Sequence, residues 1–205
     1  MILKVIIIGD YNVGKSSIVN QYINKTFCNK LILKPGTDYF QKELKFKDEI
    51  YKIHLYDTMD HERFNDLPNA YYINTNICIF TYDITNDNSF ENIINLYNHL
   101  INNLLINKAN CLCLLLGTKL DLESRRKVDT IVAKKWSRDN NILFCEISGK
   151  NNNNVTKIID DIIKLYISIS KLDRNYRDTQ DKKLSIRYFY KYLCYVYYEI
   201  KYRLS

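Results

Sequence analysis

The sequence predicts an α/β fold in which a six-stranded, mostly parallel sheet is flanked by helices. Six apolar runs of strand length follow one another along the 205 residues, and amphipathic stretches of helical length separate most of them. This alternation is typical of a parallel sheet with helices on both faces. We expect strands at residues 2–8, 39–47, 50–56, 77–83, 111–117 and 142–147.

The connections refine this prediction. The runs 39–47 and 50–56 are too close for a helix between them, so they predict an antiparallel hairpin at one edge of the sheet. In open sheets of this class, ligands bind beyond the carboxyl ends of the strands. The helices are expected to begin near Lys15, Ser89, Asp129 and Val155.

Composition excludes several classes of protein. The net charge is +7, of which +4 falls in residues 173–205, so the remaining chain offers no basic face and we expect no nucleic-acid partner. No apolar stretch approaches the roughly 20 residues that span a bilayer, and residues 1–9 are expected to form a strand rather than a signal peptide. The cysteines form no C-x-x-C pair, which favours reducing cytosol over disulfide or metal roles. They are Cys28, Cys78, Cys111, Cys113, Cys145 and Cys194.

The segment after the first apolar run fits the phosphate-binding pattern G-x-x-x-x-G-K-[S/T]. Phosphate oxygens need several convergent backbone N–H donors, and glycine lets the chain approach them closely. Here the pattern follows a strand and opens a helix, as it requires; Lys15 is expected to reach the β- and γ-phosphates and Ser16 to ligate Mg²⁺. The candidate phosphate-binding residues are Asp10, Tyr11, Asn12, Val13, Gly14, Lys15, Ser16 and Ser17.

Two later segments indicate which base the site takes. Thr118-Lys119-Leu120-Asp121 resembles the guanine motif N-K-x-D with Thr in the Asn place. Asp121 would accept hydrogen bonds from guanine N1–H and the 2-amino group, donors that adenine lacks, and a buried carboxylate left without them is costly. Ser148-Gly149-Lys150 resembles the S-A-K loop, whose backbone N–H meets guanine O6. Phe27 falls where the family that carries these motifs places an aromatic residue that stacks on the base.

Four stretches resemble the Rab branch of the Ras-like small GTPases, and the match covers about residues 1–172. The segment 82–90, Y-D-I-T-N-D-N-S-F, is very close to a Rab signature. The other three are Gly36-Thr37-Asp38-Tyr39, the segment 51–58, and the switch II residues Glu62-Arg63-Phe64 with Ala70-Tyr71-Tyr72.

This resemblance implies a P-loop G domain that binds GDP or GTP with Mg²⁺ and acts as a membrane-trafficking switch. Asp57 would hold Mg²⁺ through water. The resemblance also implies effectors, an exchange factor and an activating protein as partners. An exposed triad of Tyr39, Tyr56 and Tyr71 would contact effectors; the alternative is that these three tyrosines simply pack locally.

The departures from the family pattern concentrate where the γ-phosphate is sensed and cleaved. Lys34 aligns with a Thr that ligates Mg²⁺, although Thr37 could substitute for it. Asp60 replaces a Gly, and its carboxylate would repel the γ-phosphate by about 4 kcal/mol at about 4 Å and an effective dielectric near 20. His61 replaces the Gln that orients the attacking water, and Tyr11 replaces a small residue. His61 is therefore the candidate catalytic residue, and we expect impaired GTP hydrolysis.

The sequence leaves two questions open. The basic, tyrosine-rich tail, residues 173–205, shows no prenylation signal, and the chain shows no myristoylation signal. The tail could lie in a membrane interface, and the protein would then be cytoplasmic and peripheral on an endomembrane. Alternatively, the tail could dock on the domain or on a partner. The second question is function: a slow Rab-like switch, or a pseudo-GTPase that serves as a protein-interaction module. A P-loop ATPase or kinase is disfavoured by Asp121 and by Ser148-Gly149-Lys150.

Overall fold

A computed structural model describes residues 1–26, 38–58, 69–103, 105–107, 110–150 and 152–177. The chain separates into two compact units, residues 1–159 and residues 160–205. The predicted boundary between a domain of residues 1–172 and a tail of residues 173–205 stays a prediction. A single helix passes residue 172 and ends at Arg177.

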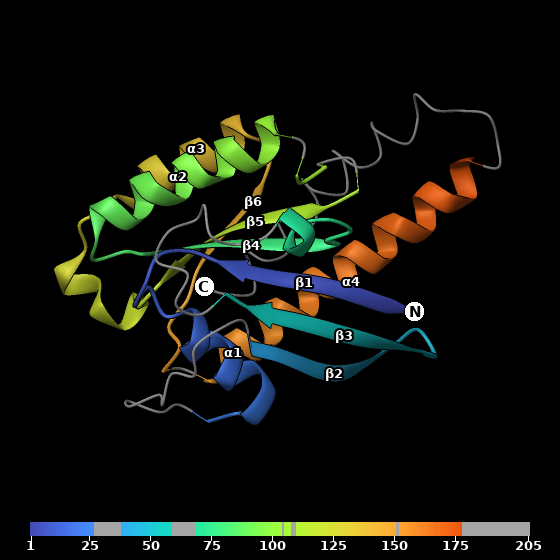
Figure 1. Ribbon diagram of the computed structural model, residues 1–205. Coiled ribbons are helices and arrows are strands. Elements are labelled where there is room, and N and C mark those ends of the chain that lie inside the picture. Colours follow the sequence, from blue (N-terminus) through green and yellow to red (C-terminus); the bar gives the residue numbers. More distant parts are fainter. Residues whose placement is uncertain (27–37, 59–68, 104, 108–109, 151, 178–205) are drawn as a thin grey trace. The chain divides into compact units, whose positions relative to one another are not determined.

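Six strands form one mixed sheet in the order β2-β3-β1-β4-β5-β6 (Figure 1). The β2–β3 pair is antiparallel and every other pair is parallel, which confirms the predicted fold class and the predicted hairpin. The hairpin turns at Lys47 and Asp48, which have φ angles of 48° and 62°. Positive φ at both central residues matches the right-handed twist of the flanking strands. The strands are β1 (Ile2–Ile8), β2 (Asp38–Phe46), β3 (Glu49–Asp57), β4 (Ile77–Asp83), β5 (Leu112–Thr118) and β6 (Leu143–Glu146).

Helices cover both faces of the sheet in the first unit (Figure 1). α2 (Asp87–Asn102) and α3 (Thr130–Asp139) lie side by side on one face, where the rings of Tyr97 and Trp136 meet with centroids 5.0 Å apart. α1 (Lys15–Asn24) covers the opposite face, where Lys42 of β2 donates to the carbonyl of Tyr22 at 2.8 Å. α4 (Asn152–Arg177) begins in the first unit and continues into the second. No helix among the described residues is long and apolar enough to span a membrane.

The core beneath α2 and α3 follows the period of each element. On β1, Ile6 and Ile8 point toward these helices, as strand alternation requires. On α2, the buried residues recur every three or four positions: Phe90, Ile93, Leu96, Tyr97 and Leu100. This packing covers one face of the central parallel strands, whose carboxyl ends lead into the loops described below.

Candidate functional site

The phosphate loop connects β1 to α1 and owes its path to two glycines. Gly14 has a φ of 100°, a conformation that L side chains rarely adopt. A Cβ on Gly9 would lie 2.2 Å from the carbonyl oxygen of Thr81, so no other residue fits against β4 there. Asn12 between them has a φ of 58°, which Asn tolerates better than most residues. The loop therefore lies close against β4 and leads into the first turn of α1.

Lys15 folds back over the phosphate loop. Its ammonium donates to the carbonyl of Gly9 at 2.9 Å and to that of Asp10 at 2.8 Å, and the side chain is buried. The loop therefore surrounds a positive charge at the amino end of a helix, where the helix dipole also favours an anion.

Thr118 links this loop to the end of β5. Its hydroxyl lies within hydrogen-bonding distance of the carbonyl oxygen of Val13 and, at 2.9 Å, of the carbonyl oxygen of Tyr82. The single hydroxyl proton can serve only one of these acceptors at a time. The Thr that replaces Asn in the predicted guanine motif therefore lies where the phosphate loop, β4 and β5 meet, and links β5 to whichever of the other two accepts its proton.

Asp121 and the loop after β6 converge. The Ser148 hydroxyl donates to Asp121 Oδ1 at 2.6 Å, and Lys150 Nζ lies 3.0 Å from Asp121 Oδ2. Burial raises the pKa of the Asp121 carboxyl, but the hydrogen bonds from Ser148 and Lys150 and the charge of Lys150 outweigh it, so the net pKa lies below the ordinary value. Asp121 therefore presents an ionised, acceptor-only group near neutral pH.

The same loop also approaches the start of α1. A Cβ built on Gly149 would lie 3.2 Å from the Cβ of Ser17. The loop after β6 is thus adjacent both to Asp121 and to the helix that carries Lys15 and Ser16. The structure brings the predicted phosphate-binding and base-reading segments together at the carboxyl ends of β1, β5 and β6.

Lys119 has a further partner that the sequence did not indicate. Its ammonium lies 2.7 Å from Asp83 Oδ2 at the end of β4. The other oxygen of Asp83 accepts hydrogen bonds from the backbone N–H and the hydroxyl of Thr85, both at 2.8 Å. The Lys119 side chain is thereby fixed by a carboxylate that is itself held in a turn.

A model of the Ras family matches residues 4–168. The chain belongs to the Ras family. It is 34% identical over 172 residues to "Ras-related protein Rab-7a" of Paramecium octaurelia, covering 83% of this chain and 84% of that one. It is 36% identical over 195 residues to "Ras-related protein Rab7A" of Mesembryanthemum crystallinum, covering 91% and 92%. A third relative, "Ras-related protein Rab7" of Cenchrus ciliaris, is 36% identical over 167 residues, covering 80% and 81%.

These matches confirm the predicted resemblance and make the chain a Rab7-related small GTPase of the Ras family. Membership implies guanine-nucleotide binding, typically with Mg²⁺, and GTP hydrolysis. It also implies, in general terms, partners that exchange nucleotide, activate hydrolysis or act as effectors.

The residues predicted for Mg²⁺ suit that ion. Asp57 ends β3, is fully buried, and pairs in register with Ile7, two residues before the phosphate loop. Ser16 stands in the first turn of α1. Mg²⁺ prefers hard oxygen ligands and commonly uses only one or two protein oxygens together with substrate phosphates and water. A carboxylate and a hydroxyl from neighbouring elements fit that requirement.

The three tyrosines predicted to contact effectors form a continuous row from Tyr39 on β2, through Tyr56 on β3, to Tyr71 at the end of a 3₁₀ turn. The ring centroids of Tyr39 and Tyr56 are 5.3 Å apart, and those of Tyr56 and Tyr71 are 6.4 Å apart. The Tyr39 residue is 48% exposed, whereas Tyr56 and Tyr71 are half-buried against the core. The row is thus partly packed and partly open, so both sequence interpretations keep their support.

Several predicted site residues lie outside the described part of the chain. They are Phe27, Lys34, Thr37, Asp60 and His61. Their predicted roles in base stacking, Mg²⁺ ligation and catalysis stay predictions.

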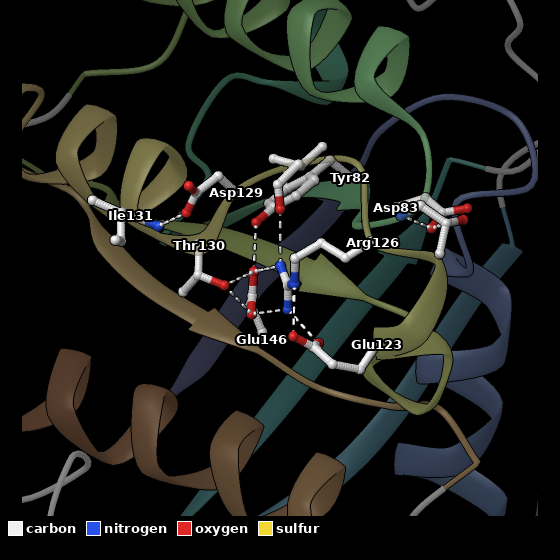
Figure 2. A network of polar contacts seen from close by, with 10 residues as sticks. Tyr82, Asp83, Glu123, Arg126, Asp129, Thr130, Ile131 and Glu146 are labelled. Atoms are coloured by element: carbon white, nitrogen blue, oxygen red, sulfur yellow. Dashed lines mark hydrogen bonds and ion pairs between the residues drawn. The ribbon is translucent and has the colours of Figure 1, made fainter.

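Sequence reasoning missed a polar network next to the site (Figure 2). Glu146, the last residue of β6, accepts hydrogen bonds from Tyr82 at 3.1 Å, from Thr130 at 3.2 Å, and from Arg126 at 2.8 and 2.7 Å. Arg126 also contacts Glu123. Burial raises the pKa of the Tyr82 phenol most, and the charge of Glu146 and its hydrogen bond with Tyr82 raise it further. The phenol therefore stays protonated and remains a donor.

One sequence signal could have indicated this network. Gly117 interrupts an otherwise apolar strand, and a glycine inside a strand often marks a close approach of other groups. A Cβ at this position would lie 2.8 Å from the Tyr82 hydroxyl and 2.8 Å from Glu146 Cγ. The missing side chain leaves the space in which Tyr82 and Glu146 meet.

Proposed function

We propose that this protein is a Rab-like switch of vesicle-mediated membrane trafficking that binds GDP and GTP with Mg²⁺ and hydrolyses GTP slowly. One observation carries the binding part of the proposal. Lys15 and Asp121 stand at the same edge of the sheet, and Thr118 links the loops that carry them. A cationic phosphate loop beside an ionised carboxylate suits a purine nucleotide whose base offers two donors.

Different residues bind the phosphates, the metal ion and the base. The backbone N–H groups of the phosphate loop and the Lys15 ammonium hold the β- and γ-phosphates, and Ser16 with Asp57 holds Mg²⁺, which supplies charge neutralisation. Asp121 accepts hydrogen bonds from guanine N1–H and the 2-amino group, and the Lys119 stem lies along the base. The loop of Ser148, Gly149 and Lys150 orients Asp121 and meets guanine O6, and Phe27 stacks on the base.

Slow hydrolysis is argued from the chemistry of four residues. Tyr11 lies on the phosphate loop with 55% of its surface exposed, so its ring has room to occupy the approach of the attacking water. Lys34, a cation, takes the place of a Mg²⁺-ligating hydroxyl, and Asp60 adds negative charge beside the γ-phosphate. His61 replaces the water-orienting amide. Since catalysis in this class is positioning and charge stabilisation, each change raises the barrier.

The proposed partners follow from the surface and the tail. The row of Tyr39, Tyr56 and Tyr71 offers effectors an aromatic contact with one exposed ring. Residues 173–205, with a net charge of +4 and many tyrosines, suit contact with an anionic endomembrane surface. The protein would then be cytoplasmic and peripheral on that membrane.

The first test identifies the nucleotide that denatured, purified protein releases, with Lys15→Ala as a variant expected to release none. GDP or GTP at close to one per chain supports the proposal. ATP contradicts it. Empty protein that also fails to take up GDP favours the alternative function, a pseudo-GTPase that serves as a protein-interaction module; the four substitutions around the γ-phosphate motivate that alternative.

The second test addresses hydrolysis separately. Single-turnover GTP hydrolysis is compared between the natural protein and the double variant Asp60→Gly, His61→Gln, with GTP affinity measured for both. We expect the double variant to be at least about tenfold faster, since each restored group acts on the transition state. Equal rates at equal affinity would contradict the proposed impairment.

A further inference from the structure

We propose that Arg126 is a positioning residue that holds the two base-reading loops in register and thereby sets the selectivity for guanine. The base-reading loops are residues 118–126, which carry Asp121, and residues 147–150, which follow β6. This role rests on the proposed function, because it requires Asp121 to read guanine.

Arg126 bridges the two loops through a single guanidinium group. Its Nη2 lies 2.6 Å from Glu123 Oε2 in one loop and 2.7 Å from Glu146 Oε2, at the end of β6 directly before the other loop. Its Nε donates to Glu123 Oε1 at 2.9 Å and its Nη1 to Glu146 Oε1 at 2.8 Å. The guanidinium is a rigid planar fork, so two carboxylates bound to it are fixed in mutual geometry as well as attracted (Figure 2).

The Glu146 end of this bridge is fixed by the sheet. The Glu146 side chain is 9% exposed, and it also accepts hydrogen bonds from Tyr82 on β4 and Thr130 at the start of α3. The backbone N–H of Ile147, the next residue, donates to the carbonyl of Gly117 at 2.8 Å, and the carbonyl of Ile147 accepts from the N–H of Leu120 at 3.2 Å. Arg126 is therefore held against a part of the molecule that has little freedom to move.

At the other end of the bridge, the position of Glu123 determines the position of Asp121. Residues Leu120–Arg125 form tight 3₁₀ turns, in which Leu122 N donates to the carbonyl of Lys119 at 2.8 Å and Arg126 N to that of Glu123 at 3.0 Å. Only one residue separates Glu123 from Asp121, so a displacement of Glu123 displaces the carboxylate that reads the base. The Glu123 side chain is 59% exposed, so its pairing with Arg126 adds little stability through burial.

Two roles for Arg126 make different predictions. An ion pair that only stabilises the fold would lower the melting temperature when broken and leave base selectivity unchanged. A positioning residue would change selectivity, because a displaced Asp121 loses its contact with the 2-amino group. GDP has that group and inosine diphosphate lacks it, so the ratio of the two affinities reports the position of Asp121 directly.

The experiment measures the dissociation constants of GDP and inosine diphosphate for the full chain and four variants. Glu123→Ala opens the exposed end of the bridge, and Arg126→Lys keeps the charge but loses the fork. Ser124→Ala and Arg125→Lys are matched controls at neighbouring exposed residues. We expect the preference for GDP to fall about three- to tenfold in the first two variants, as the loss of one hydrogen bond implies, and to stay unchanged in the controls.

The outcomes separate this role from the proposed function. If the natural protein binds neither diphosphate, the proposed function fails and the positioning role fails with it. If it prefers GDP and both bridge variants keep that preference, even with a lower melting temperature, the positioning role is overturned and the proposed function stands. If Arg126→Lys does not fold, Glu123→Ala decides alone, because it leaves the buried Glu146 paired.

Discussion

The hydroxyl of Thr118 and the carbonyl oxygen of Val13 form a direct hydrogen bond between the end of β5 and the phosphate loop. These residues are distant in sequence, and each belongs to a different part of the nucleotide site. A position that departs from the family's guanine motif therefore supplies its own contact between the part proposed to hold phosphates and the part proposed to read the base.

Replacing Thr118 with Val should loosen this link. Val keeps the shape of Thr but removes the hydroxyl, so the buried carbonyl of Val13 loses a donor. We expect the free energy of unfolding to fall by about 1–2 kcal/mol and GDP release to accelerate several-fold. Denaturant unfolding and release of a fluorescent GDP analogue measure the two effects. Thr75→Val, which removes another buried Thr hydroxyl but at the amino end of β4, is the matched control, and an equal effect on release from both variants would contradict the link.

Much of the fold could be predicted because it depends on local pattern. The run 77–83, I-C-I-F-T-Y-D, is mostly apolar, and β4 has those same limits. The segment joining the hairpin strands leaves room only for a tight turn, which Lys47 and Asp48 form. The start of α2 at Asp87 rather than near Ser89 shows the usual limit, since polar residues in a first turn carry little apolar periodicity.

The candidate site was predictable only where a motif specifies it. The phosphate loop is continuous in sequence, so Lys15 could be assigned from spacing alone. The pairing of Arg126 with Glu146 spans 20 residues and depends on the β5–β6 register, which places Glu146 beside Gly117. The contact between Lys119 and Asp83 likewise depends on the register of β4 and β5. Sequence patterns do not encode such pairings, because many charged residues could satisfy them.

Gly117→Ala tests whether the space above this glycine is needed. The new Cβ would lie 2.8 Å from both the Tyr82 hydroxyl and Glu146 Cγ, so the buried network must shift. We expect the free energy of unfolding to fall by about 1–3 kcal/mol, the usual cost of overpacking a core. Gly149→Ala is the control, because its Cβ would meet Ser17 Cβ at 3.2 Å and needs only a small adjustment. A Gly117 variant as stable as the Gly149 variant would show that the space is not required.

Asp83→Asn should weaken nucleotide binding through Lys119. The substitution keeps an oxygen for the Thr85 donors but removes the charge 2.7 Å from the Lys119 ammonium. In the proposed site the lysine then loses its fixed position along the base, and we expect GDP release to accelerate about tenfold, the equivalent of one charge-assisted hydrogen bond. Glu91→Gln, an exposed acid on α2, serves as the charge-matched control. Release rates that match in the two variants would contradict this role for Asp83.

The depressed pKa of Asp121 predicts how stability depends on pH. Because the folded-state pKa lies below the ordinary value of 3.8, the contacts with Ser148 and Lys150 stabilise the fold fully above that value. Their contribution decreases as pH falls below 3.8, where Asp121 in the unfolded chain takes up a proton. It is lost once pH falls below the folded-state pKa, where Asp121 in the folded protein takes up the proton as well. The difference in unfolding free energy between the natural protein and Asp121→Asn should therefore stay constant from about pH 7 to pH 5 and shrink only in stronger acid. Chemical denaturation at a series of pH values measures this difference, and a decline that begins near neutral pH would mean that Asp121 is not held as an ion by these two partners.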